Sequence, residues 1–223
     1  SESADMSVAY SELLPLGLSK KLIQKICKTY GSPEIAIQVC KENPYDLIKK
    51  VNGISFAAAD TIALKCGHDM NSVLRAESIV YNILQQQGSN GKSYLYYNQL
   101  IQLINESVDI DLQKVVEAIE NMVHTDVVKL IDDGKEICLT YYFKLEQQIS
   151  QQLKRLMISE SNIKIPENWR EIISELEDEQ GWKHTDEQLN GIEQTLFNNV
   201  VVITGQAGTG KSTVTNAMCR ILN

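Results

Sequence analysis

The residues best suited to chemistry form a glycine-rich stretch near the carboxyl end, Gly205, Gln206, Ala207, Gly208, Thr209, Gly210, Lys211 and Ser212. They follow the G-x-x-x-x-G-K-[ST] pattern of a phosphate-binding loop, or P-loop, whose glycines let successive backbone N–H groups face a phosphate. Lys211 is the candidate catalytic residue, because it would reach the β- and γ-phosphate oxygens. Ser212 would hold Mg²⁺ through the nucleotide, and the helix expected to open at Thr213 points its positive end at the same anion. The pattern predicts a nucleoside triphosphate site.

A strand before the loop and a helix after it must position these residues. Residues 200–204 read Val, Val, Val, Ile and Thr, a β-branched run typical of a buried parallel strand. One strand and one helix cannot bury their own apolar surface, so a P-loop domain needs several parallel strands covered by helices on both faces. No second run of this character lies upstream. Residues 185–223 are therefore expected to be the truncated start of a P-loop α/β ATPase domain.

The expected domain lacks the acidic partner of Mg²⁺ and any arginine finger. The chain is accordingly interpreted as a fragment that hydrolyses no ATP by itself. A chance match to the four fixed positions of the motif occurs in roughly 1% of chains of this length, and the flanking elements make it rarer still.

The net charge of −8 argues against a nucleic-acid partner only if its distribution is ignored. Residues 1–67 contain 8 Lys and Arg against 7 Asp and Glu, whereas residues 158–199 contain 3 against 10. Most of the acidity lies between Glu160 and Glu193, and residues 158–184 are interpreted as an acidic connector. The overall charge says little about the amino-terminal face.

The cysteines favour a cytoplasmic protein with reduced thiols. They are odd in number and lack C-x-x-C spacing, so buried core thiols are predicted in place of a metal or disulfide site. The five positions are Cys27, Cys40, Cys66, Cys138 and Cys219. The three histidines are far apart in the sequence and suggest no metal site. No apolar run approaches 18 residues and no charged-then-apolar leader is visible, so neither a membrane span nor secretion is predicted.

An internal repeat lies at the amino-terminal end. Residues 17–31 and 53–67 both begin with glycine, an aliphatic residue and serine, continue as a helix and close on a glycine. Between them, Ser32 and Asn43 each stand before a proline, which predicts a capping side chain followed by proline at the first helical position. The pattern predicts a tandem helix-hairpin-helix domain over residues 1–70.

The turns of such hairpins could hold DNA. Their N–H groups and the following helix N-terminus bind a phosphate without reading bases. The candidate DNA-binding residues are Gly17, Ser19, Lys20, Lys21 and Gly53. The two lysines support contact at the first turn, whereas Phe56 and three alanines follow the second turn and favour packing. The alternative is that the hairpins are structural helical pairs.

Residues 71–157 predict a winged-helix-like α+β unit with a connecting helix. A β-hairpin is expected from residues 127–131 and 136–141, because the turn between them contains Asp132, Asp133 and Gly134. The elements expected before the hairpin are helices at 72–88, 98–106 and 111–124 and a strand at 94–97. Together these elements follow the order of a winged helix.

The expected helix at 111–124 would be the recognition helix of a DNA-binding winged helix. It sets Lys114 against Asp111, Glu117 and Glu120, so base reading is not expected. The unit is interpreted as a scaffold or as a surface for a protein partner.

Residues 51–75 and 185–213 together resemble the RecD/TraA-type superfamily-one DNA helicases, specifically the RecD-like enzymes with an added amino-terminal region that occur outside the RecBCD complex. The resemblance covers the chain from Leu14 onward. The order of hairpins, winged helix, Gln188 and P-loop is specific to this family. Residues 88–94 depart from the Gly-His-Thr-Tyr-like turn of the relatives. The hairpins also depart from the usual pattern, since Ser19 and Ser55 stand where a second glycine is common.

The resemblance implies an ATP-driven, Mg²⁺-dependent motor that moves 5′ to 3′ on single-stranded DNA and unwinds duplex in repair or recombination. Its DNA partner would be single-stranded or forked and recognised without regard to sequence. Gln188 would recognise adenine by accepting from N6 and donating to N7. The expected nucleotide-binding set is then Gln188 with residues 205–213. The alternative is a DNA-structure or partner-binding module of another P-loop DNA-dependent ATPase.

Overall fold

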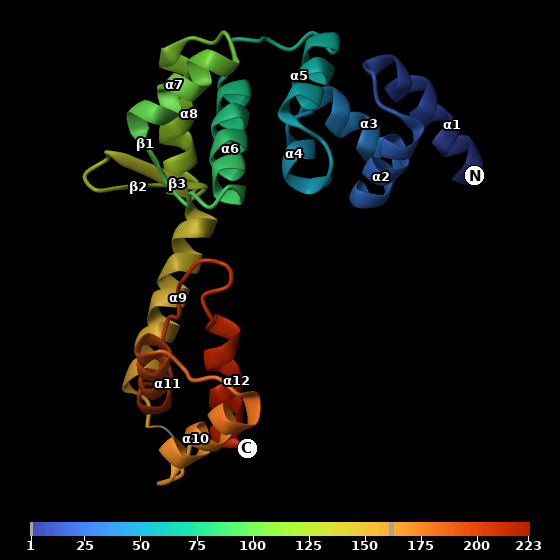
Figure 1. Ribbon diagram of the computed structural model, residues 1–223. Helices are drawn as coiled ribbons and strands as arrows, with labels where there is room; N and C mark the ends of the chain where they lie inside the picture. Colours follow the sequence, from blue (N-terminus) through green and yellow to red (C-terminus); the bar gives the residue numbers. More distant parts are fainter. Residues whose placement is uncertain (1, 161–162) are drawn as a thin grey trace. The chain divides into compact units, whose positions relative to one another are not determined.

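The computed structural model describes residues 2–160 and 163–223 and divides the chain into two compact units (Figure 1). The boundary between the units lies between Leu145 and Glu146. Each unit has its own apolar core, and each is considered by itself. The described residues are mainly helical and contain one small antiparallel sheet.

The amino-terminal unit begins with short helices, which are α1 (Glu2–Leu13), the 3₁₀ turn η1 (Leu14–Leu16), α2 (Lys20–Tyr30), α3 (Pro33–Glu42), α4 (Asp46–Lys50) and α5 (Phe56–Lys65). Serine hydroxyls cap α2, α3 and α5 from positions 19, 32 and 55. The predicted cap at Asn43 is wrong. The Asn43 N–H instead donates to Val39 O and completes α3, and α4 begins only at Asp46.

The two predicted repeats share one backbone geometry. Gly17 and Gly53 have φ values of 96° and 94°, a left-handed conformation that glycine adopts without a Cβ penalty. The aliphatic residue after each glycine, Leu18 or Ile54, is buried beneath its turn. Each turn therefore has an apolar anchor below and an exposed backbone above, which is the arrangement that a hairpin needs to present its amides.

The remainder of this unit consists of α6 (Val73–Ser89), β1 (Leu95–Tyr96), α7 (Tyr97–Ser107), α8 (Leu112–His124), β2 (Val128–Ile131) and β3 (Glu136–Leu139). The strands form an antiparallel sheet in the order β1-β3-β2, with Val128 opposite Leu139 and Leu95 opposite Ile137. The predicted hairpin is confirmed, and its turn contains Asp132 and Asp133 at positive φ.

Helix α6 is the central element of the amino-terminal unit. It packs against α5, α7, α8 and β3, and its buried apolar face includes Ile79, Val80, Ile83 and Leu84. Near its end, a side chain at Gly88 would collide with the ring of Tyr142. The predicted helix at 72–88 is therefore confirmed as a core helix, which joins the short helices to the three-stranded sheet.

The second unit, Glu146–Asn223, contains most of α9 (Thr140–Ile158), then α10 (Trp169–Gln180), α11 (Asp186–Phe197) and α12 (Lys211–Leu222). Helix α12 packs against both α10 and α11. Their small core is built from Trp169, Ile173, Ile192, Leu196, Val214, Ala217 and Ile221. The acidic segment predicted as a connector thus contributes a packed helix to this unit.

The strand predicted at residues 200–204 is not formed. These residues are irregular, and Val202 and Ile203 are 81% and 37% exposed. A parallel strand needs a neighbouring strand to satisfy its N–H and C=O groups, and the described part of the second unit contains none. The helix after the loop does form, but it starts at Lys211, two residues before Thr213.

In the described part of the chain the five cysteines are joined by no disulfide. Cys27, Cys40 and Cys138 are buried, and burial raises the pKa of Cys40 to about 12, so this thiol is unreactive. Cys219 is exposed, so its assignment to a core is wrong. Among the residues described, no helix combines the length and apolar character that a membrane crossing needs. No His, Cys, Asp and Glu side chains gather there in a group that could hold a metal ion.

Candidate functional sites

The first hairpin turn exposes backbone donors beside two lysines. The Gly17 N–H donates to Leu14 O at 2.9 Å, and the chain then turns into α2. Ser19 caps this helix by accepting from Leu22 N at 3.3 Å. The N–H groups of Lys20 and Lys21 occupy the first helical positions, where the helix itself supplies no acceptor. The turn therefore combines free amides, the positive end of α2 and two ammonium groups.

The second turn repeats this construction. Gly53 precedes the buried Ile54, and Ser55 caps α5 by accepting from Ala58 N at 3.2 Å. The serines stand where many hairpins have a second glycine, yet Ser19 and Ser55 have φ values of −73° and −84°. The backbone at this position is extended and needs no glycine. The departure from the usual pattern therefore leaves the turn geometry intact and adds a helix cap.

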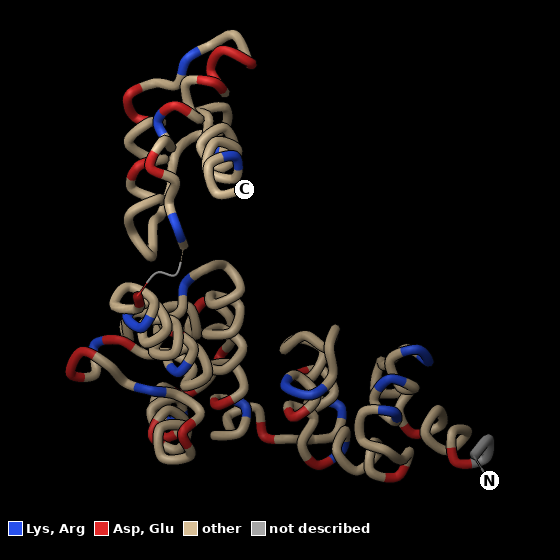
Figure 2. The backbone as a smooth tube through the Cα atoms, turned by 90° about the horizontal axis from the view of Figure 1, so that it is seen from below, with Lys and Arg blue, Asp and Glu red and all other residues tan. Residues whose placement is uncertain are grey.

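Two acidic side chains of the short helices are paired with lysines. Glu12 pairs with Lys41 at 2.5 Å, and Asp46 pairs with Lys50 at 2.8 Å. Lys20, by contrast, lies over the ring of Tyr10 at 5.8 Å from its centroid. Figure 2 shows basic positions along the amino-terminal helices and a predominance of acidic ones in the segment of α10. The hairpin region thus has cations available to an anion although its net charge is close to zero.

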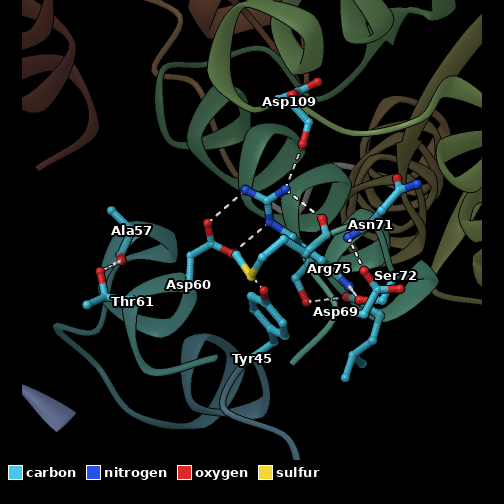
Figure 3. A network of polar contacts seen from close by, with 12 residues as sticks. Tyr45, Ala57, Asp60, Thr61, Asp69, Asn71, Ser72, Arg75 and Asp109 are labelled. Atoms are coloured by element: carbon cyan, nitrogen blue, oxygen red, sulfur yellow. Dashed lines mark hydrogen bonds and ion pairs between the residues drawn. The ribbon is translucent and has the colours of Figure 1, made fainter. Parts of the chain in front are cut away.

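A part-buried network of polar contacts fixes the second hairpin to α6 (Figure 3). The Arg75 guanidinium binds both carboxylate oxygens of Asp60, at 2.8 and 2.9 Å. It also donates to the carbonyl oxygens of Met70 and Asp109, each at 2.8 Å. Tyr45 donates to Asp60 at 2.6 Å, and burial raises the pKa of its hydroxyl. Since Asp60 belongs to α5, this network sets the orientation of the helix that the second turn introduces.

Two lysines that the sequence did not single out contact the turns. Lys25, on α2, donates to Asn52 O beside Gly53. Lys65, on α5, donates to Pro15 O at 3.1 Å beside Gly17. The second turn therefore has a cation nearby, although Phe56 and the three alanines that follow it in the sequence offer none. No sequence pattern indicates these contacts, because they join residues 27 and 50 positions apart.

The glycine-rich loop of the second unit is closed on its own lysine. Lys211 Nζ donates to the carbonyl oxygens of Gly205 and Gln206, at 2.7 and 2.6 Å. Thr209 Oγ1 also donates to Gln206 O, at 2.8 Å. The lysine is thus directed at the loop, and Ser212 beside it is exposed. A triphosphate would have to replace these carbonyl oxygens as the partner of the ammonium group.

Gln188 lies against this loop. A side chain at Gly210 would collide with Gln188 Nε2, so the amide covers the last glycine of the loop. Gln188 also belongs to a capping box: its N–H donates to Thr185 Oγ1 at 3.3 Å, and its Oε1 accepts from Thr185 N at 3.0 Å. Its acceptor oxygen is therefore already used. Adenine recognition through both amide atoms would require the box to open.

A buried histidine that sequence reasoning missed supports the start of α11. The His184 N–H and Nδ1 lie 2.9 and 3.0 Å from Glu177 Oε1, and these hydrogen bonds lower the pKa of Glu177. The contact ties α10 to the residue before the capping Thr185. His184 Nε2 is buried and has no partner among the described residues. A single histidine preceding a cap gives no sequence signal of this role.

Helix α8 does not present a basic surface. Val115, Ala118, Ile119 and Met122 are buried, and Lys114 pairs with Glu117 at 3.2 Å. Asp111 caps the helix by accepting from Gln113 N. These contacts agree with the interpretation of this helix as packing and scaffold.

Comparison with known protein families finds a match that includes both turns. Residues 2–94 match the family model described as the ATP-dependent RecD2 DNA helicase HHH domain. The matched range contains both turns, the lysines beside them, and Arg75 with its partners Asp60 and Met70, whereas Asp109 lies outside it. It ends directly before β1, so α6 is included.

Proposed function

We propose, from the premise that the chain carries a RecD2 DNA helicase helix-hairpin-helix domain over residues 2–94, that it forms the amino-terminal part of an ATP-dependent 5′ to 3′ DNA helicase. The observation that carries the proposal is the paired geometry of Gly17 with Ser19 and Gly53 with Ser55 inside the matched range. Two like turns with exposed amides suit the sugar-phosphate backbone, which is uniform along DNA. The domain would therefore bind single-stranded or forked DNA without base specificity.

The proposed DNA contacts are Gly17, Ser19, Lys20, Lys21 and Gly53. At the first turn the amides and the two lysines would bind the same phosphate. Hydrogen bonds from ammonium groups to phosphate are charge-assisted and stronger than those between neutral groups, so the lysines would add to the affinity. The second turn offers the same backbone, and Lys25 brings an ammonium group to it.

The proposed nucleotide site consists of residues 205–213 with Gln188. The contact between Gln188 and Gly210 supports this assignment, because it joins the expected adenine-recognising residue to the expected phosphate loop across 22 positions. ATP would displace the loop carbonyls from Lys211, and Mg²⁺ would be bound by Ser212 and the phosphates. ATP supplies the free energy for translocation, while the residues of this chain bind and orient it.

The unit from α6 to β3 is proposed to be a winged helix. Its order of helix, strand, two helices and β-hairpin and its strand order β1-β3-β2 support this assignment. The acidic character of α8 favours a scaffold or protein-binding role over base reading. Domain limits of 1–70, 71–157, 158–184 and 185–223 remain part of the proposal.

The experiment that tests DNA binding compares two pairs of substitutions in the 223-residue chain. Fluorescence anisotropy with labelled forked and single-stranded DNA of several sequences measures affinity against salt concentration. Replacing Lys20 and Lys21 by Ala should weaken all DNAs about equally and reduce the slope of log K against log salt by roughly one to two units. The control, Lys154→Ala with Arg155→Ala on α9, should leave the slope unchanged. Unchanged affinity and slope in the Lys20 and Lys21 variant would show that the hairpins are scaffold.

A further inference from the structure

We infer that Lys25 and Lys65 act as crossed DNA-positioning residues, which means that each lysine belongs to one hairpin and contacts the turn of the other. Each ammonium group would hold the opposite turn in place and add a positive charge there for a DNA phosphate. The inference rests on the proposed binding of DNA by these turns. It extends that proposal to two residues outside the turns and to a coupling between the two hairpins.

The contacts are reciprocal. Lys25 lies on α2, which follows the first turn, and donates to Asn52 O in the second turn. Lys65 is the last residue of α5, which follows the second turn, and donates to Pro15 O in the first turn at 3.1 Å. The two residues are not equivalent in the repeat, since they lie 40 positions apart and the repeats lie 36 apart. The crossing is therefore a property of the packed pair of hairpins.

The contact of Lys65 places its ammonium group close to the glycine of the first turn. A Cβ atom at Gly17 would lie 3.3 Å from Lys65 Nζ, which is tighter than most side-chain contacts. Among the described residues, and apart from the chain neighbours of Gly53, no atom lies within 4 Å of the corresponding position there. Lys65 thus lies next to the turn glycine, while Lys25 reaches the residue before its glycine.

Both ammonium groups keep the capacity to bind an anion. Each has three donors, and one carbonyl oxygen takes one of them. Both side chains are exposed, and in residues 2–160 and 163–223 neither forms an ion pair with a carboxylate. A phosphate at either turn would meet the free amides of one hairpin and a lysine of the other. The carbonyl contact orders the lysine in advance, which lowers the entropy that binding must otherwise remove.

This arrangement changes the expected balance between the hairpins. Phe56 and the alanines after it give the second turn no cation of its own, and Lys25 compensates for that. Removal of one lysine should therefore weaken the DNA contact of the opposite hairpin. A purely local model predicts that a substitution on α2 affects the first turn alone.

The test uses the 223-residue chain with Lys25→Met and Lys65→Met and a matched control, Lys28→Met, on the same helix as Lys25. Lys28 is exposed and forms no ion pair in the described part of the chain. Anisotropy with forked DNA at a series of salt concentrations gives affinity and salt slope. Each test variant should lose about threefold to tenfold in affinity at low salt and reduce the slope by roughly one unit. Lys28→Met should change neither quantity.

Arginine variants separate a charge effect from a folding effect. Lys25→Arg and Lys65→Arg keep the cation and should restore the salt slope, whatever small change in thermal unfolding they cause. A methionine variant that lowers the unfolding temperature but keeps the wild-type slope would overturn the inference, because the lysine would then be only structural. A full slope loss that arginine does not restore would overturn it as well.

Double substitutions test the crossing itself. Lys65→Met should be non-additive with Gly17→Ala and additive with Gly53→Ala in the free energy of DNA binding. Lys25→Met should show the opposite pattern. If the wild-type chain binds no DNA, or if Lys20 and Lys21 do not affect the slope, the proposed function fails. If those results hold and the crossed pattern is absent, only the crossed arrangement fails.

Discussion

The two motif-bearing regions of this chain differ in how much of their geometry is local. At the hairpins, a glycine with positive φ, a buried aliphatic residue and a capping serine reproduce the same turn twice. At the glycine-rich loop the helix and the loop are present, but the preceding β-branched run is irregular and exposed. A turn satisfies its hydrogen bonds within a few residues, whereas a parallel strand depends on distant partners. The geometry of the hairpins is therefore completed by nearby residues, and that of the loop is not.

The largest expected effect follows from substituting Lys211 in the complete reading frame. Lys211→Ala should lower the rate of ATP-driven unwinding of a forked duplex by at least about 100-fold, because a charge at the transferring phosphate is lost. DNA affinity without nucleotide should stay within about twofold, because Lys211 is not among the proposed DNA contacts, which lie at the hairpins. Unwinding assays and anisotropy on the same preparation measure both quantities. An equal loss of DNA affinity would contradict the separation of the two sites.

The 223-residue chain is the natural control for that experiment. It is expected to show no DNA-stimulated ATP turnover. In the described residues we assign a glycine-rich loop, but no catalytic carboxylate and no arginine finger, and ATP hydrolysis needs all three. Turnover that disappears in Lys211→Ala would show that the closed loop is already competent.

The next effect concerns the stability of the hairpin region. Arg75→Met leaves the part-buried Asp60 without its cation, which should destabilise the amino-terminal unit by about 3 kcal/mol. Trp169 and Trp182 are the two tryptophans of the chain, and both belong to the second unit. Tryptophan fluorescence should therefore keep its urea midpoint while the far-ultraviolet circular dichroism transition moves to lower urea. Arg220→Ala, which breaks an exposed pair with Glu179, should shift neither signal measurably. A fluorescence shift in Arg75→Met would show that the two units unfold together.

A smaller effect is expected from the helix caps. Ser19→Ala and Ser55→Ala each remove one side-chain acceptor and should cost about 1 kcal/mol of stability. Ser32→Ala removes an equivalent cap on α3, away from the two turns, and should cost the same. DNA binding distinguishes them: affinity should fall in the turn variants, because their helix starts loosen, and stay constant in Ser32→Ala. Equal DNA affinity in all three variants would mean that cap order does not matter for binding.

The sequence predicted the parts that short-range chemistry decides. Glycine and serine spacing identified both turns, and Asp132 to Gly134 identified the β-hairpin. The strand at 200–204 was wrong, because a β-branched run indicates strand preference and not the presence of a partner strand. Asn43 was misassigned because a residue before proline can end one helix as readily as begin another. The lysines at 25 and 65 and the buried His184 depend on contacts between distant segments, and composition and spacing carry no record of those contacts.

The smallest expected effect is a pH dependence confined to the second unit. Hydrogen bonds from His184 lower the folded-state pKa of Glu177 below its ordinary value of 4.5, so its carboxylate stabilises the unit above that pH. This contribution should be lost as the pH falls from 4.5 through the lower folded value. Glu177→Gln should therefore lower the urea midpoint of tryptophan fluorescence near pH 7, and its difference from the wild type should shrink in acid.

The control is Glu175→Gln, a substitution at an exposed neighbour on α10, which should have the same urea midpoint as the wild type across this pH range. A Glu177→Gln difference that stays constant from pH 7 to acid would mean that the glutamate acts by shape and not by charge. The contact between Glu177 on α10 and His184, the residue before the capping Thr185, would then be a packing contact. The start of α11, which carries Gln188, would be held without help from the charge of Glu177.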